Sequence, residues 1–169
     1  YARNPLYAHA AFNIDWGGDD DTGMQAGRGH RMAIMSADGD YTNVGIAMTP
    51  NTVPTNTIGP LVTTGNYVGA NTGQPDHYNR FIVGTVWEDL DENGRYGAGE
   101  GRGGVTVMPD DGTYYAVTGN SGGYAIPVNA GSYQVTFSGG GIATAQQPIT
   151  VGADSALLDH MAEDAPPVR

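Results

Sequence analysis

The chain has 169 residues, and its seven basic and eighteen acidic side chains give a formal net charge of −11 at pH 7. This excess of negative charge disfavours nucleic acids and anionic membranes as partners. The absence of cysteine excludes disulfides and thiol chemistry, and no apolar run approaches the roughly 18 residues that a membrane-spanning helix needs.

The first part of the chain predicts two helices followed by two strands. Asn4–Trp16 carries apolar residues at roughly helical spacing, and Pro5 suits a first helical turn. Gly23–Ser36 predicts a second helix, because its larger side chains recur every three or four residues. Two strands are expected over residues 41–48 and 58–67, with an exposed loop between them over residues 49–57. So few elements form a thin core, which is typical of a fragment.

Two stretches of this part carry a family resemblance. Gly29–Ser36 contains a Gly-His-Arg element, and Tyr41–Ala47 follows with a Val-Gly-Ile signature. Together they resemble the C-terminal motif of bacterial CAP-superfamily (SCP-like) domains, the cysteine-rich secretory, antigen 5 and pathogenesis-related group. The resemblance implies that residues 1–73 are the C-terminal portion of an α-β-α sandwich, with His30 in its cleft. The other cleft residues would then precede Tyr1, so we expect a processed or partial product whose N-terminal segment is missing.

His30 has two interpretations. Beside Arg31, and within reach of Asp38 or Asp40, it can act as a titrating group of a cleft. A lone histidine is also commonly a packed or capping residue. The resemblance to CAP-type binding proteins adds the expectation of a lipid or peptide ligand near this side chain.

Residues 74–80 form a short polar stretch that predicts a linker. After it, strand-like segments alternate with Gly, Asn and Asp turn signals at short spacing, which is typical of a β-sandwich. Tyr133, Val135 and Phe137 alternate with polar residues and should share one face. The expected strands are 81–87, 105–108, 113–117, 124–128, 132–137, 144–151 and 156–160, and residues 162–169 are expected to form a flexible tail.

The connection after the first of these strands has a calcium-loop pattern. Residues 89–100 place oxygen-bearing side chains at loop positions 1, 3 and 5, glycine at position 6 and glutamate at position 12. Ca²⁺ takes six to eight oxygen ligands, and alternate residues of a tight loop aim at one point. An acidic turn in an acidic protein is the alternative. The predicted ligands are Asp89, Asp91, Asn93, the carbonyl of Arg95, and Glu100.

The surroundings of the loop indicate what calcium does there. A calcium sensor has helices on both sides of its loop, whereas here Phe81–Trp87 precedes it and Gly104–Met108 follows, both rich in β-branched or aromatic residues. Without a helix pair to open, calcium should stabilise the fold and should not switch it.

The same region resembles a second family. The residues that carry the likeness are Gly84–Gly94, Gly99-Glu100, Gly104–Val107, Gly122–Tyr124 and Gly131–Val135. They are similar to the B-type immunoglobulin-like repeats of bacterial surface adhesins. The resemblance covers nearly all of residues 81–160 and implies an all-β immunoglobulin-like sandwich that binds Ca²⁺ between two strands. Such repeats serve as rigid spacers or ligand presenters and are not enzymes.

Two motif matches and an aromatic set have simpler explanations. Gly119–Gly123 fits the G-x-S-x-G pattern of hydrolases around Ser121, but a strand and not a helix follows it. Gly99–Gly104 fits G-x-G-x-x-G, and again a strand follows. Cross-strand packing explains the tyrosines of the sandwich, whereas a carbohydrate platform would need several exposed together. These tyrosines are Tyr114, Tyr115, Tyr124 and Tyr133.

The sequence as a whole predicts an α+β CAP-like fragment followed by an immunoglobulin-like sandwich over residues 81–161. We expect a secreted, non-catalytic, calcium-stabilised module at the cell surface or outside cells. Its expected partners are further copies of itself or the missing N-terminal segment. A CAP-type binding protein is the alternative, and a hydrolase using Ser121 or His30 has the least support.

Overall fold

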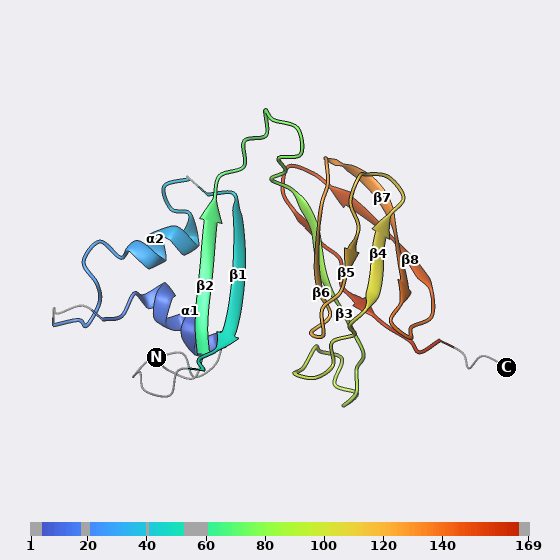
Figure 1. Ribbon diagram of the computed structural model, residues 1–169, viewed down its shortest axis with the longest axis horizontal. Coiled ribbons are helices and arrows are strands. Elements are labelled where there is room, and N and C mark those ends of the chain that lie inside the picture. Colours follow the sequence, from blue (N-terminus) through green and yellow to red (C-terminus); the bar gives the residue numbers. More distant parts are fainter. Residues whose placement is uncertain (1–4, 18–20, 40, 53–60, 166–169) are drawn as a thin grey trace. The chain divides into compact units, whose positions relative to one another are not determined.

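The computed structural model describes residues 5–17, 21–39, 41–52 and 61–165 (Figure 1). The chain divides into two compact units, unit 1 (Tyr1–Asn71) and unit 2 (Thr72–Arg169). The stretch predicted as a linker, residues 74–80, therefore groups with unit 2.

Unit 1 contains two short helices and one hairpin. The hairpin is antiparallel, with Asn43 opposite Val68 at one end and Pro50 opposite Leu61 at the other. Both helices lie on one side of it (Figure 1). The elements are α1 (Pro5–Ile14), α2 (Gly29–Met35), β1 (Asn43–Pro50) and β2 (Leu61–Val68).

Two boundaries in unit 1 differ from the prediction. Helix α2 begins at Gly29 and not at Gly23, because Gly27 and Arg28 have φ angles of 75° and 49°. These left-handed conformations are incompatible with a continuous helix. Strand β1 extends to Pro50, into the segment predicted as a loop. The start of the second predicted strand, residues 58–60, lies outside the described residues.

Unit 2 consists of two four-stranded sheets. In the first, β3 pairs with β6, β9 and β10; in the second, the order is β5-β4-β7-β8. The first sheet contains β3 (Phe81–Trp87), β6 (Gly123–Pro127), β9 (Ala156–Leu157) and β10 (His160–Met161). The second contains β4 (Val105–Pro109), β5 (Ala116–Val117), β7 (Gly131–Gly139) and β8 (Ala145–Val151).

The core of unit 2 lies between the sheets. On β7, Tyr133, Val135 and Phe137 are buried while their neighbours are more exposed, as the alternating pattern predicts. They pack with Ile82 and Val86 of β3 and with residues from several other strands in one cluster. The prediction of a β-sandwich for this part is confirmed. The immunoglobulin-like and CAP-like assignments remain predictions.

Three segments of unit 2 depart from the predicted strands. Only Ala116–Val117 of the expected strand 113–117 pairs, because the residues before it form an exposed turn. The expected strand 156–160 divides into β9 and β10, where the Asp159 carboxylate accepts a hydrogen bond from Thr85 N–H. The expected flexible tail is anchored at its start, since Ala162 is buried and its N–H donates to the Trp87 carbonyl. Residues 166–169 lie outside the described part.

Candidate functional site

The calcium-loop pattern lies on the connection from β3 to β4. Glu92 and Gly94 have φ angles of 58° and 73°, so the backbone reverses tightly at loop positions 4 and 6. The glycine at position 6 adopts this left-handed conformation at no steric cost. The loop therefore has the local geometry that its sequence predicts.

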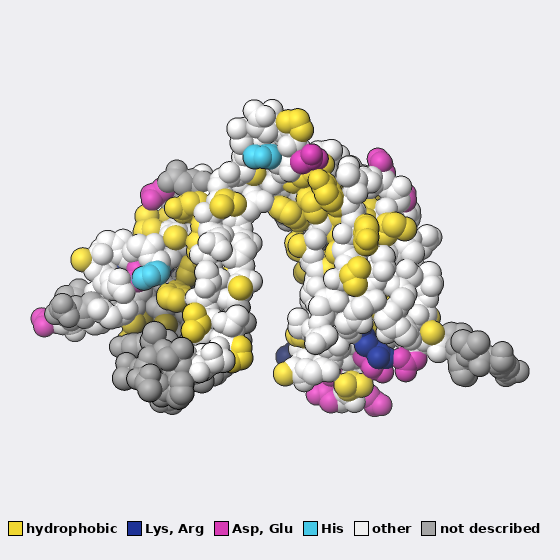
Figure 2. All heavy atoms as spheres, in the orientation of Figure 1, with side chains coloured by type: hydrophobic (Ala, Val, Ile, Leu, Met, Phe, Trp, Pro, Cys, Tyr) yellow, Lys and Arg dark blue, Asp and Glu magenta, His cyan; other side chains and the backbone are white. Residues whose placement is uncertain are grey.

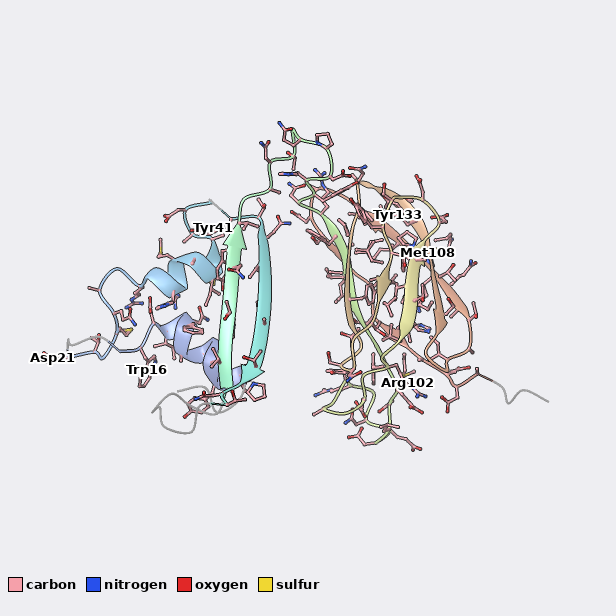
Figure 3. The ribbon with its side chains drawn as sticks, viewed as in Figure 1. Trp16, Asp21, Tyr41, Arg102, Met108 and Tyr133 are labelled. Carbon is pink, nitrogen blue, oxygen red and sulfur yellow. The ribbon has the colours of Figure 1, made fainter. Side chains whose placement is uncertain are left out.

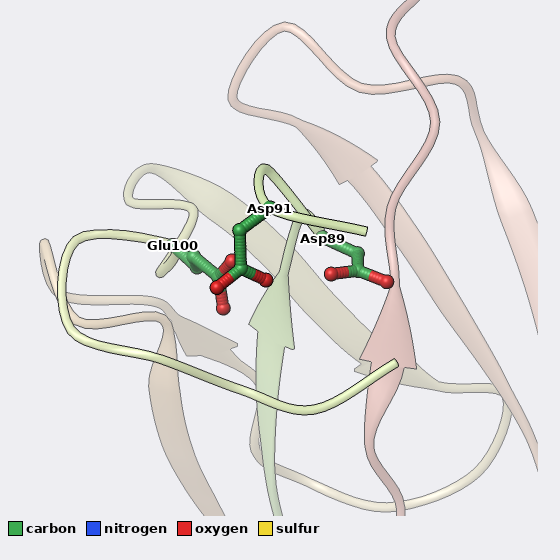
Figure 4. Close-up of side chains that lie close together, drawn as sticks. All are labelled: Asp89, Asp91 and Glu100. Atoms are coloured by element: carbon green, nitrogen blue, oxygen red, sulfur yellow. The ribbon is translucent and has the colours of Figure 1, made fainter. Parts of the chain in front are cut away.

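Three carboxylates of this loop come together. Asp89, Asp91 and Glu100 each offer an oxygen, and these oxygens lie within 4.8 Å of one another (Figure 4). Glu100 is buried, with 5% of its surface exposed, whereas Asp91 is exposed. Among the residues that the structure describes, none of the three forms a salt bridge with a basic side chain. Three gathered negative charges without a basic partner make a site that a cation would neutralise.

Backbone N–H groups orient the carboxylates. The Asp89 carboxylate accepts hydrogen bonds from Asn93 N–H at 3.0 Å and from Gly94 N–H at 2.8 Å. Glu100 accepts from Leu90 N–H through Oε1 at 3.0 Å and from Gly97 N–H through Oε2. Each carboxylate oxygen has a second lone pair, so these bonds fix the side chains without preventing metal coordination.

The other two predicted ligands occupy the same loop. The Asn93 amide donates to Asp91 Oδ2 at 2.7 Å, and its oxygen accepts from Arg95 N–H at 2.8 Å. Asn93 is thus adjacent to the acidic cluster, held by its neighbours on both sides. Coordination by Asn93 and by the Arg95 carbonyl remains a prediction.

The loop is fastened to the rest of unit 2 at its base. Glu88 N–H donates to the Glu100 carbonyl at 2.9 Å, and the Tyr96 hydroxyl donates to the Ser121 carbonyl at 3.1 Å. The ring of Tyr96 also meets Trp87 edge to face, with centroids 6.3 Å apart. A rigid base keeps the acidic ligands close together, which lowers the entropic cost of binding an ion.

Arg102 extends this attachment to the end of the chain. Its guanidinium contacts Glu88 at 3.0 Å and also pairs with Asp164. Figure 2 shows acidic side chains gathered at this end of unit 2, with basic atoms beside them. The arginine thus joins the residue before the calcium loop to the segment that follows β10.

The two glycine motifs are structural. Ser121 lies in a turn closed by a hydrogen bond from Gly122 N–H to the Gly119 carbonyl, and β6 follows it directly. A hydrolase nucleophile needs a helix at that point. The stretch 99–104 leads into β4 in the same way. The interpretation of both as turns between strands is therefore supported by the observed elements.

In unit 1, His30 pairs with a residue that the sequence did not suggest. The ring Nδ1 of His30 lies 2.7 Å from Asp15 Oδ1, and the backbone N–H of His30 donates to Asp15 Oδ2 at 2.9 Å. The expected partners were Asp38 and Asp40; Asp40 lies outside the described residues. Asp15 is almost fully buried and has a φ of 64°, directly after α1. The pair therefore joins the end of α1 to the start of α2.

The electrostatics of Asp15 follow from this contact. Burial acts to raise the pKa of its carboxyl, but the hydrogen bonds from the His30 ring and from the backbone of His30 and Arg31 outweigh it, and the pKa is lowered. A carboxylate that stays ionised keeps a fixed orientation for the imidazole.

An apolar cavity of about 440 Å³ adjoins this pair. It lies between the helices and the hairpin and is lined by α1, α2, β1 and β2. The ring of Phe12 lies 5.2 Å from that of His30, so one wall is aromatic. Its other side chains include His9, Ile34, Ile46 and Tyr67.

Comparisons with known proteins leave the family open. No family model and no curated protein matches the chain. One solved structure with some likeness is a type II cohesin–X-dockerin complex from Acetivibrio cellulolyticus, at 23% identity over 48% of this chain and 52% of that one, with a TM-score of 0.39. Another is a proposed carbohydrate-binding protein from Bacteroides uniformis, at 18% identity over 52% and 42%, with a TM-score of 0.38. The chain thus spans about half of each, and likeness at these TM-scores does not assign the chain to a family.

Proposed function

We propose that the chain is a non-catalytic structural or adhesive module, secreted or held at the cell surface, whose sandwich is stabilised by Ca²⁺. The observation that carries the proposal is the cluster of Asp89, Asp91 and buried Glu100, which has no basic partner among the described residues. The resemblance to adhesin repeats supports the same interpretation. In the described part of the chain, no helix is long and apolar enough to span a membrane.

The chemistry of the cluster favours calcium over other cations. All side-chain donors are oxygens, which disfavours Zn²⁺ in a site without His or Cys. A twelve-residue loop with glycine at position 6 and glutamate at position 12 is the pattern of Ca²⁺ sites, whereas Mg²⁺ usually keeps several waters and binds through one or two carboxylates. Three carboxylates gathered in one such loop therefore favour Ca²⁺.

The position of the loop supports a stabilising role. Because β3 belongs to one sheet and β4 to the other, an ion held in the connection would stiffen the segment that links the two sheets. Extracellular sites of this kind bind calcium at about 10⁻⁴–10⁻³ M. At about 1 mM Ca²⁺ and a Kd of about 10⁻⁴ M, binding adds roughly 1.4 kcal/mol to the free energy of unfolding.

Terbium luminescence tests the site directly. Tb³⁺ replaces Ca²⁺ at oxygen sites and emits when a nearby indole or phenol is excited. Trp87 and Tyr96 adjoin the loop, so we expect sensitised emission that Ca²⁺ quenches by competition. Glu100→Gln should weaken binding at least about tenfold, because it removes the charge of a ligand expected to be bidentate.

Asp154→Asn is the matched control for this experiment. Asp154 is an exposed acidic residue before β9, and its loss should leave the terbium affinity unchanged. Equal affinities for the wild type and Glu100→Gln would show that the loop is an ordinary acidic turn.

As part of this function, we propose that copies of the chain associate through the β1–β2 hairpin of unit 1. Neither β1 nor β2 contains a charged residue, and in the described part of unit 1 they pair only with each other. Uncharged edge strands accept further strands readily. Val68 of β2, which does not line the cavity, is 53% exposed and adds apolar surface. A second copy of the chain would cover this hairpin.

Sedimentation velocity tests the assembly. We expect oligomers that Val68→Lys dissociates, whereas Val117→Lys in unit 2, at a similarly exposed position, should not. A compact monomer in which both units melt cooperatively would contradict assembly through the hairpin.

The cavity beside His30 favours a second candidate, a CAP-type binding protein for a lipid or an apolar peptide. A largely apolar lining with the imidazoles of His9 and His30, the latter held by Asp15, suits a ligand with an apolar body and a polar group. A fluorescent fatty acid is a suitable probe, and His30→Ala should weaken its binding. Unchanged affinity in that variant would count against this candidate.

A further inference from the structure

A second cavity lies at the end of unit 2 opposite the calcium loop. Strand β3 runs from one end to the other, with Tyr78 just before it and the loop just after it. Figure 3 shows the labelled Tyr133 and Arg102 at these two ends. The cavity has a volume of about 470 Å³. We call it the tyrosine groove, and it is formed by Tyr78, by the turn 111–113 between β4 and β5, and by residues 127–133 between and within β6 and β7.

Aromatic rings fix the shape of the tyrosine groove. The ring of Tyr133 is buried, and its hydroxyl donates to the Asn129 carbonyl at 2.8 Å. Tyr78 meets Tyr114 edge to face, with centroids 5.8 Å apart and an interplanar angle of 89°. The Tyr114 hydroxyl in turn donates to Asp76 at 3.3 Å. The rings are therefore held in place before any ligand arrives, which lowers the entropic cost of binding.

Hydrogen-bonding side chains surround these rings. Asp111, Thr113, Asn129 and Ser132 all line the tyrosine groove, and their side chains carry a carboxylate, an amide and two hydroxyls. The Ser132 hydroxyl also pairs with that of Thr150 at 3.1 Å, and Asp111 Oδ1 accepts from Gly112 N–H, which leaves Oδ2 of Asp111 for a ligand. The pKa of the Tyr133 hydroxyl is raised, mainly by burial and to a smaller extent by the negative charge of Asp111. The Asp111 carboxylate therefore lies close enough to Tyr133 to influence its hydroxyl electrostatically. Among the residues that the structure describes, no Lys or Arg lines the groove.

This combination selects a class of ligand. A pyranose ring has apolar C–H faces that pack on aromatic rings and a rim of hydroxyls that donate and accept hydrogen bonds. The groove volume lies within the usual range for small-molecule sites. A carboxylate without a basic neighbour in the lining disfavours anionic sugars. We propose that the tyrosine groove binds a neutral saccharide, with Tyr78 as the stacking residue and Asp111 as a hydrogen-bond acceptor.

The proposal goes beyond the structural role and does not depend on calcium binding. The groove and the calcium loop lie at opposite ends of β3, and they share no residue. A module that both stiffens and holds a glycan would act as an adhesive element. Failure of either site would leave the other unaffected.

Isothermal titration of the whole chain with neutral oligosaccharides tests the groove. The panel contains gluco-, xylo-, manno- and chito-oligosaccharides of two to six units, with oligogalacturonate as the anionic comparison. We expect saturable binding of at least one neutral series and none of oligogalacturonate. Tyr78→Ala should lower the affinity about tenfold, which is the worth of one aromatic stack, and Tyr78→Phe should retain most of it.

Two further variants make the result decisive. Asp111→Ala, in an exposed turn, removes an acceptor without disturbing the core and should also weaken binding severalfold. Tyr7→Ala removes an exposed tyrosine from unit 1 and should change nothing. Absence of saturable binding across the panel, or equal affinities for the wild type, Tyr78→Ala and Asp111→Ala, would overturn the proposal.

Discussion

The two units differ in how much apolar surface they bury. Unit 2 has a continuous core of thirteen buried residues between its sheets. Among the described residues of unit 1, only Ala8 and Asp15 are buried. Leu6 and Ile46 of unit 1 are 76% and 69% exposed, although both are large and apolar.

This difference separates a self-sufficient domain from a dependent one. A chain segment folds stably when its buried apolar surface outweighs the entropy lost on ordering. Unit 2 meets this requirement through its sandwich, whereas unit 1 has an apolar cavity and open strand edges instead. We therefore propose that unit 2 provides stability and that unit 1 mediates assembly.

The largest effect is expected in the core of unit 2. Phe137 is fully buried and packs edge to face with Tyr124, with centroids 6.2 Å apart. Phe137→Ala should destabilise unit 2 by about 3–5 kcal/mol through lost burial and a residual cavity. Urea unfolding followed by the fluorescence of Trp87 measures this loss.

Leu6→Ala is the contrasting variant in unit 1. Since Leu6 is largely exposed, the isolated chain should lose no more than about 0.5 kcal/mol. A loss as large as that of Phe137→Ala would show that unit 1 has a packed core of its own.

Acid should weaken unit 2 through one buried histidine. The ring of His160 stacks on Phe137 at 4.4 Å, and its Nε2 is buried without a hydrogen-bond partner. Burial lowers the pKa of the His160 imidazole, and the Glu163 carboxylate opposes this only in part. The unfolded chain, with a pKa of about 6.5, then binds the proton first as the pH falls.

Stability should therefore be constant well above pH about 6.5 and fall as the pH drops through this value, by up to about 1.4 kcal/mol per pH unit, until the folded-state pKa is passed. Urea unfolding of calcium-depleted protein in calcium-free buffers between pH 7.5 and pH 5 follows this slope without interference from calcium. His160→Leu should flatten the slope, and His77→Leu, at an exposed position, should not. An unchanged slope in His160→Leu would contradict the assignment.

A smaller effect is expected where the chain end joins the calcium loop. Arg102 bridges Glu88 and Asp164, and its side chain is 26% exposed. Arg102→Gln should lower the opening free energy of residues 162–165 by about 1 kcal/mol, the upper range for such pairs. Hydrogen exchange of the Ala162 and Ala165 amides measures it. Arg80→Gln is the control, and equal protection in both variants would contradict the bridge.

Local sequence patterns were sufficient to predict the structure wherever residues close in sequence determine it. Strand β3 has the bounds that its β-branched residues predict, and β7 buries alternate residues because a strand has a period of two. The reversal at Gly94 follows from a glycine at loop position 6. The candidate metal site was accessible for the same reason, since its ligands lie within twelve consecutive positions.

Contacts between distant residues were not accessible in this way. Asp15 and His30 meet only because α1 and α2 are adjacent, and no spacing rule relates them. The division between β9 and β10 depends on Asp159 accepting from Thr85, far away in the chain. One signal could have pointed to Asp15. It is an acidic residue directly after a predicted helix, and a carboxylate is favourable beside the N-terminus of a neighbouring helix.

The most direct test of the central claim is a thermal melt of the whole chain in 1 mM Ca²⁺ and in EGTA. The account predicts that Ca²⁺ raises the melting temperature of unit 2 by roughly 5–10 °C, corresponding to about 1.4 kcal/mol, and that Glu100→Gln removes the increase. Identical melting temperatures in Ca²⁺ and EGTA would contradict the claim that calcium stabilises this sandwich.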